Sequence, residues 1–144
     1  MPKAFWLLKT EPNAYHYDDL MRDGSTHWDG VRNYQARNNI KIMSPGDIAF
    51  IYHSVGPKEV VGIAQVTSKH YPDPTDKEDK GWVVVDIKPR KKLTTPIHLE
   101  VFKNDKVLSQ TPLVKQSRLS VVPLTLVQAK RLLSICGQES FASK

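Results

Sequence analysis

The segment from Trp28 to Asn39 carries the side chains with the clearest capacity for chemistry in this sequence. Its twelve residues include two arginines, three asparagines, a glutamine, a tyrosine and a tryptophan. Ordinary surface helices favour Glu, Lys and Ala, whereas asparagine is a poor helix former. The segment therefore gives up helix propensity for planar groups that donate and accept hydrogen bonds, which suits a planar polar ligand.

These residue types match the chemistry of a nucleobase. Asn and Gln can pair with the edges of bases, Arg can contact phosphate or a purine edge in a bidentate way, and aromatic rings stack on base faces. Asn33 and Arg37 lie four residues apart, as do Tyr34 and Asn38, so each pair shares a helix face. The alternative is a surface helix capped by Asn33, with its other polar groups merely solvated. The segment alone does not decide between the two.

The elements that must position this segment are predicted from apolar runs and turn signals. Ala36, Ile40 and Met43 recur at helical spacing, and the turn at 44–47 ends that helix. The remaining predicted elements are strands at 5–8, 48–52, 60–66, 82–87 and 119–122, helices at 15–22 and 125–136, a proline-rich loop at 71–75, and a strand or short helix at 97–102. This pattern favours an α+β fold with a curved, mixed, mainly antiparallel sheet or barrel.

Length and composition describe one soluble globular domain. The chain has 144 residues, of which 40% are hydrophobic and 25% charged. The net charge of +6 favours anionic partners without requiring them. A single cysteine, Cys136, and the lack of a signal peptide or a membrane-length apolar run predict a reducing compartment, either the cytoplasm or, in a eukaryote, the nucleus. The sequence does not fix the oligomeric state, and we expect a monomer.

Chemistry other than binding has little support. The five histidines show no metal-ligand spacing, and no phosphate loop or nucleophile elbow is present, so we expect no catalytic residue, metal or cofactor. A hydrolase built from Lys9, Glu11 and His53 stays open on residue types, as does a module that binds a peptide or a small molecule. The basic run at 88–92 could follow a phosphate backbone, but a solvated strand end is the simpler interpretation.

Five motifs, in order along the chain, together resemble the EVE domain. They are Lys9-Thr10-Glu11-Pro12 after a Trp-Leu-Leu strand, the segment 28–38, Tyr52-His53-Ser54, Tyr71-Pro72-Asp73-Pro74, and Ser117-Arg118-Leu119-Ser120-Val121. The resemblance extends from about Ala4 to Leu133, so we assign the domain to 1–136 and expect a disordered tail at 137–144. It implies a PUA-like pseudobarrel, related to YTH readers of methylated RNA. It also implies a non-catalytic reader that binds a modified base in DNA or RNA.

The matching motifs imply which residues surround an extruded base. We expect Trp28 and Tyr52 to be stacking walls. Asparagine, serine and arginine side chains are expected to read base edges or contact phosphate. His53 could donate to a base or act as an acid, because histidine titrates near neutrality. The predicted pocket consists of Lys9, Trp28, Arg32, Asn33, Tyr34, Arg37, Asn38, Tyr52, His53, Ser54, Ser117 and Arg118.

Several of these residues have a structural alternative. Trp28 could belong to the core, Arg32 could pair with Asp29, and Tyr52 could cap the end of a barrel. Trp82, at the head of a predicted strand, could wall the pocket or pack in the core. Because the motifs lie far apart in sequence, the prediction requires that Lys9, residues 52–54 and residues 117–118 converge on the Trp28 to Asn39 segment.

Overall fold

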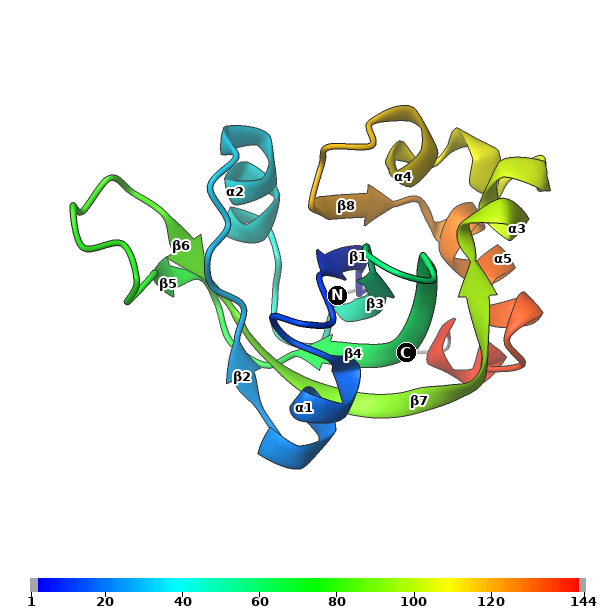
Figure 1. Ribbon diagram of the computed structural model, residues 1–144, viewed down its shortest axis with the longest axis horizontal. Coiled ribbons are helices and arrows are strands. Elements are labelled where there is room, and N and C mark those ends of the chain that lie inside the picture. The colour runs from blue at the N-terminus through cyan, green and yellow to red at the C-terminus, as the bar shows by residue number, and fades with distance from the viewer. Residues whose placement is uncertain (1–2, 143–144) are drawn as a thin grey trace.

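A curved sheet with short helices around it forms the centre of the molecule (Figure 1). The computed structural model describes residues 3–142. The strands are β1 (Phe5–Thr10), β2 (Thr26–His27), β3 (Ile48–His53), β4 (Glu59–Val66), β5 (Tyr71–Pro72), β6 (Val83–Val84), β7 (Asp86–His98) and β8 (Val121–Leu124). The helices are α1 (Tyr17–Asp23), α2 (Tyr34–Lys41), α3 (Leu99–Asn104), η1 (Leu108–Gln110), α4 (Pro112–Lys115), α5 (Leu126–Ile135) and η2 (Glu139–Ala142).

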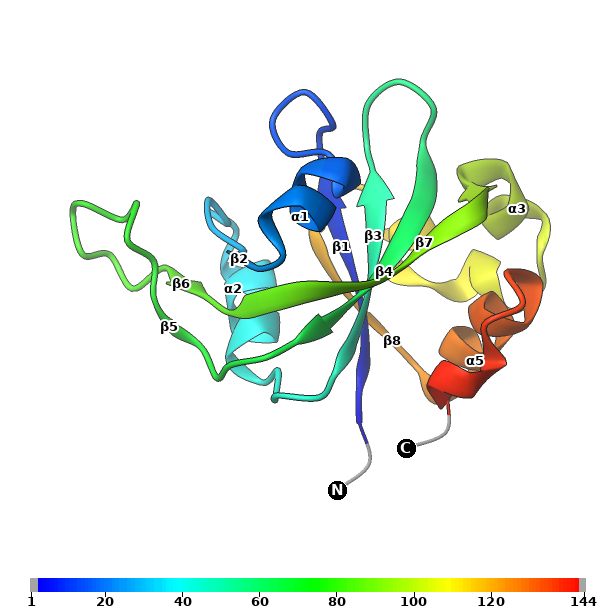
Figure 2. The same cartoon turned by 90° about the horizontal axis from the view of Figure 1, so that it is seen from below.

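The sheet has the order β2-β7-β4-β3-β1-β8, and β5 pairs with β6 in a separate ribbon. Among residues 3–142, β1 and β3 are the one parallel pair. α1, α2 and the β5–β6 ribbon lie toward one side of the sheet, and α3 and α5 lie at the other (Figures 1 and 2). The predicted α+β fold with a curved, mixed, mainly antiparallel sheet is therefore confirmed.

β7 departs most from the elements predicted by sequence. The strand expected at 82–87 is divided between β6 and β7, and β7 continues to His98. The basic run at 88–92 thus lies within a long strand, not at a strand end. Its exposed lysines and arginine hide the apolar alternation that would have indicated a strand. The segment 97–102 ends β7 and begins α3.

Two smaller differences concern the loop at 71–75 and the tail at 137–144. Tyr71 and Pro72 form β5, whose place in a two-stranded ribbon tolerates a proline. Within the tail, Glu139–Ala142 form η2, and Phe141 packs against the core. Residues 143–144 of the expected tail lie outside the described residues. No helix within the described range is long and apolar enough to cross a membrane.

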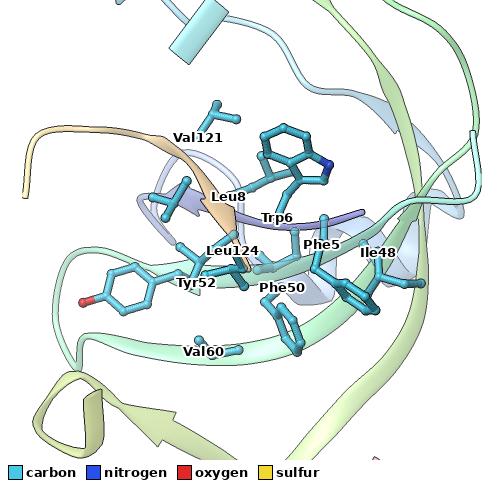
Figure 3. Close-up of a cluster of buried hydrophobic side chains, with 14 of the residues drawn as sticks. Phe5, Trp6, Leu8, Ile48, Phe50, Tyr52, Val60, Val121 and Leu124 are labelled. Atoms are coloured by element: carbon cyan, nitrogen blue, oxygen red, sulfur yellow. The ribbon is translucent and has the colours of Figure 1, made fainter. Parts of the chain in front are cut away.

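The core packs on both faces of the sheet at the strand β3. Every residue of β3 is buried. The indole Nε1 of Trp6 donates to the Asp47 carboxylate at 3.0 Å, so a polar atom within the core is paired. The cluster drawn in Figure 3 joins β1, β3, β4 and β8 through Phe5, Trp6, Leu8, Ile48, Phe50, Tyr52, Val60, Val121 and Leu124.

α1 is held against β4 by a close approach at Gly62. The ring of Tyr17 is fully buried, and its hydroxyl donates to the Ile63 carbonyl at 2.7 Å. A Cβ at position 62 would lie 2.4 Å from this ring. His16 and Asp19 cap the helix start reciprocally. α1 therefore has a fixed position, which matters because Tyr15 lies next to His16, the residue that caps the helix.

The buried carboxylate of Asp73 fastens the Trp28 to Arg32 segment to the turn after β5. One oxygen accepts from the Gly30 amide at 2.9 Å and from the Arg32 guanidinium at 3.0 Å. The other accepts from the amide and hydroxyl of Thr75, at 2.7 and 2.6 Å. Burial alone would raise the pKa of Asp73, but the hydrogen bonds from Thr75, Gly30 and Arg32 outweigh it and lower the pKa to about 2.

We predict that Gly62→Ala destabilises the protein because the new methyl group would collide with the ring of Tyr17. The cost should be roughly 1–3 kcal/mol, as for overpacked cores. Urea unfolding measures it. Gly56→Ala is the comparison, since nothing lies within 4 Å of a Cβ at Gly56 and only its positive φ of 77° is strained. Equal stability of Gly62→Ala and the wild type would contradict the close packing of α1.

We predict that Asp73→Asn costs about 2 kcal/mol at neutral pH, because an amide cannot accept hydrogen bonds at both positions of the carboxylate. The folded pKa is lowered from 3.8 to about 2. The stabilisation from this group is therefore complete above about pH 4 and is lost as the pH falls toward about 2. The variant should lack that part of the pH dependence in urea unfolding.

The control for Asp73→Asn is Asp29→Asn, which removes an exposed carboxylate from the same segment. Its cost at neutral pH should stay within about 0.5 kcal/mol. Equal stability of Asp73→Asn and the wild type at neutral pH would show that Asp73 does not hold the segment.

Candidate functional site

A cavity of about 430 Å³, which we call the main cavity, opens where the end of β1 meets the connection from β2 to α2. Its size falls in the range of small-ligand pockets. The lining residues come from three stretches of chain, 9–15, 26–32 and the position before β8. They are Lys9, Thr10, Ala14, Tyr15, Thr26, His27, Trp28, Asp29, Gly30, Val31, Arg32 and Ser120.

Two aromatic rings in fixed positions contribute to the wall. Tyr15 and Trp28 meet edge to face, with ring centroids 6.3 Å apart. The Tyr15 hydroxyl donates to Asp23 at 2.8 Å, and the Trp28 amide donates to the Val85 carbonyl at 2.8 Å. Trp28 is largely buried, so the alternative in which it belongs to the core is correct in part, although it also lines the main cavity. The rings offer a preformed surface for a planar ligand.

A hydrogen-bond donor and a hydrogen-bond acceptor line the main cavity together with the two rings. The Lys9 ammonium donates to the Ser117 carbonyl at 2.7 Å, which leaves two of its three N–H groups for other acceptors. Burial and, to a lesser extent, the charge of Lys58 lower the pKa of Lys9. At the other side, Asp29 pairs with His27 at 3.3 Å and supplies a carboxylate acceptor. The main cavity thus presents a cationic donor and an anionic acceptor.

The structure divides the predicted pocket among several places. Lys9, Trp28 and Arg32 line the main cavity. A shallower depression of about 290 Å³ is lined by Asn33, Gln35, Gln116, Ser117, Arg118 and Leu119. The contact between Lys9 and Ser117 joins the main cavity to this depression, so the segments near 9, 28–33 and 117–118 do lie together.

Four predicted pocket residues of the Trp28 to Asn39 segment, Asn33, Tyr34, Arg37 and Asn38, do not line the main cavity. Tyr34 and Arg37 form a cluster with Trp82, described below, and the Asn38 amide oxygen accepts from the Arg37 guanidinium. Asn33 caps α2 by accepting from the Ala36 amide at 2.9 Å, which is the role that the alternative interpretation gave it. Arg32 pairs with Asp73 and not, as considered from the sequence, with Asp29.

The motif at 52–54 lies behind the main cavity and does not line it. Tyr52 is buried in the core cluster (Figure 3), and burial raises its pKa to about 12. The Nε2 atom of buried His53 accepts from the Tyr17 amide at 3.2 Å. Burial lowers the pKa of His53, and the charge of the neighbouring His16 lowers it further. Ser54 donates its amide to the Thr10 carbonyl at 3.0 Å and so fixes a lining residue from behind.

Sequence reasoning missed the residues whose role depends on tertiary contacts. Tyr15, Asp29 and Ser120 line the main cavity, and Asp73 orders one of its walls. Asp73 and Ser120 belong to motifs of the resemblance, which was the available signal. Within residues 3–142 there is no group of three or more His, Cys, Asp or Glu side chains placed to hold a metal ion.

Known proteins resemble this chain over nearly its whole length. Residues 4–135 match the EVE domain. Human thymocyte nuclear protein 1 is 32% identical over 170 residues, which cover 94% of this chain and 75% of the human protein. The NMR structure of Rpa0253 from Rhodopseudomonas palustris has a TM-score of 0.86 and 43% identity and covers 93% of both chains.

Two structures similar to this one contain nucleic acid. The crystal structure of human THYN1 protein in complex with DNA containing 5-methylcytosine has a TM-score of 0.83 and 30% identity, and covers 92% of this chain and 97% of that chain. The YTH domain of Zygosaccharomyces rouxii MRB1, in complex with N6-methyladenosine RNA, has a TM-score of 0.59 and 11% identity, and covers 92% of this chain and 86% of that one. The second likeness concerns the fold alone, and it agrees with the expected PUA-like architecture. With the family match over 132 consecutive residues, 4–135, this chain belongs to the EVE domain family.

Proposed function

We propose that this protein is a non-catalytic reader that binds DNA and holds a modified base in the main cavity. The observation that carries the proposal is the combination of two fixed aromatic rings with the Lys9 ammonium and the Asp29 carboxylate around one cavity. The structure of a relative, at 30% identity, in complex with DNA containing 5-methylcytosine supports DNA as the partner and a modified pyrimidine as the base.

The chemistry of cytosine fits these groups. Its exocyclic amino group is a donor that a carboxylate such as Asp29 can accept from. Its ring carbonyl is an acceptor to which the Lys9 ammonium can donate a hydrogen bond. Tyr15 and Trp28 supply apolar surface for the ring and for a methyl substituent. A thymine would place a carbonyl where cytosine has its amino group, so two acceptors, that carbonyl and the Asp29 carboxylate, would face each other.

A base can reach such a cavity only after it leaves the helical stack. Extrusion costs a few kcal/mol, which contacts to the base and backbone must offset. The depression that joins Asn33 to Ser117 and Arg118 adjoins the main cavity through Lys9 and has the amide, hydroxyl and guanidinium groups that contact phosphates. The net charge of +6 adds attraction that does not depend on sequence.

The arrangement favours binding over catalysis. A hydrolase built from Lys9, Glu11 and His53 would need these three side chains around one substrate, yet of the three only Lys9 lines the main cavity. His53 is buried, and its Nε2 atom is occupied by the Tyr17 amide. A general acid or base must reach the proton that it transfers. Turnover of a nucleotide by the purified protein would overturn this part of the proposal.

We predict that Lys9→Met weakens binding to DNA with a single 5-methylcytosine by about tenfold or more, because the base loses a charged donor, an interaction of roughly 1.5–3 kcal/mol. Binding to the same DNA with plain cytosine should weaken by a similar factor, because both bases carry the ring carbonyl that Lys9 contacts. Fluorescence anisotropy with both oligonucleotides measures the two quantities.

Lys41→Met is the matched control, since it removes the same charge from the exposed end of α2, outside the main cavity. Its effect on both oligonucleotides should be equal and small. For the wild type, affinity for both should fall as salt rises, because bound counterions are released on association. Equal affinity of the wild type for the two oligonucleotides, or unchanged affinity of Lys9→Met for the methylated one, would contradict the proposed function.

A further inference from the structure

An aromatic stack lies outside the main cavity, between α2 and the β5–β6 ribbon. The rings of Tyr34 and Trp82 are stacked, with centroids 5.2 Å apart and planes inclined by 24°. The Arg37 guanidinium carbon lies 5.1 Å from the Tyr34 centroid and 5.7 Å from the Trp82 centroid. The Arg32 guanidinium carbon lies 5.5 Å from the Trp82 centroid. We call these four residues the aromatic platform.

One face of Tyr34 is open. Suppose that the Arg37 guanidinium lay on the face of Tyr34 opposite Trp82. Its distance from the Trp82 centroid would then approach the sum of the Arg37–Tyr34 and Tyr34–Trp82 distances. It is instead nearly equidistant from the two rings, so the guanidinium lies alongside the pair. Tyr34 remains 67% exposed, which is far more than a ring needed for packing. A flat aromatic face is thus presented to solvent with a cation at its edge.

Secondary structure and hydrogen bonds hold the residues of the aromatic platform in position. The Trp82 amide donates to the Asp76 carboxylate at 3.0 Å, which fixes the chain at the root of the ribbon. Tyr34 is the first residue of α2, directly after the Asn33 cap. The acidic groups near Trp82 are engaged, since Asp76 also accepts from the Lys80 amide and Glu78 pairs with the Lys80 ammonium at 2.8 Å.

Arg32 places the platform beside the main cavity. Its side chain lines the main cavity, is fixed by Asp73, and also faces the Trp82 ring. A strand whose modified base occupies the main cavity would therefore have a neighbouring nucleotide within reach of Tyr34. Aromatic faces with adjacent arginines are the usual means of holding unpaired bases without regard to sequence.

We propose that the aromatic platform binds a second nucleobase, the unpaired neighbour of the base in the main cavity, by stacking on the open face of Tyr34. Arg37 contacts the phosphate of that nucleotide. This inference rests on the proposed function, because the modified base in the main cavity determines which nucleotide reaches Tyr34. It adds that the protein holds two unstacked nucleotides and binds single strands through Tyr34.

The test compares Tyr34→Leu, Tyr34→Phe and the wild type on three ligands. The ligands are a single-stranded oligonucleotide with one 5-methylcytosine, the same strand with abasic sites on both sides of that base, and 5-methyldeoxycytidine monophosphate. Calorimetry measures the strands and NMR titration the mononucleotide. Ile42→Ala is the control, because Ile42 is also 67% exposed and adjoins the other end of α2.

Tyr34→Leu should bind the intact strand roughly 5- to 100-fold more weakly than the wild type, as expected for the loss of one base–aromatic stack. Its affinity for the abasic strand and the mononucleotide should match the wild type, and Tyr34→Phe and Ile42→Ala should match it throughout. Wild-type affinity of Tyr34→Leu for the intact strand would overturn the inference. If Tyr34→Leu is weakened but the wild type does not prefer the methylated base, the platform stands and the proposed base pocket fails.

Discussion

The buried carboxylate of Asp73 is the interaction on which the candidate site depends. It accepts from the Gly30 amide and the Arg32 guanidinium on one side and from Thr75 on the other, and it lies outside the sheet that forms the core. Without it, the connection from β2 to α2 would lose the hydrogen bonds that Gly30 and Arg32 donate to Asp73, and would keep the exposed hydrogen bond from Arg32 to Thr75. The same carboxylate sets the direction of Arg32, which separates the main cavity from the aromatic platform. A buried anion is stable here because it accepts hydrogen bonds from two backbone amides, a hydroxyl and a guanidinium.

The remaining supports of the main cavity act from behind it. Ser54 fixes the end of β1 through Thr10, and His53 accepts from the first amide of α1, which belongs to Tyr17, two residues after Tyr15. Lys9 ties β1 to the chain before β8. The motif at 52–54, expected to contact the ligand, thus acts through its neighbours. The sheet supports the site, and loops supply most of its lining residues. This arrangement is common in binding proteins.

Much of the fold could be predicted from the sequence, because β1, β3, β4 and α5 carry strong local signals. The Thr125 and Gln128 capping box places the start of α5 correctly. β2 and β5 have two residues each and exist only through pairing with distant strands, so no local pattern indicates them. The candidate site was predicted less well for a geometric reason. Tyr52 and His53 are neighbours in a strand, and successive side chains point to opposite faces, so both could not enter one pocket. Asn33 begins a helix that turns Tyr34 and Arg37 away from the main cavity.

The central claim is that a modified base leaves its stack and lies in the main cavity, and a crystal structure of this protein with a short DNA that contains one 5-methylcytosine tests it most directly. We expect the methylated ring in the main cavity against Trp28 and Tyr15, with its amino group at hydrogen-bonding distance from Asp29. A structure in which that base stays stacked and paired in the duplex, with the DNA bound elsewhere on the surface, would contradict it.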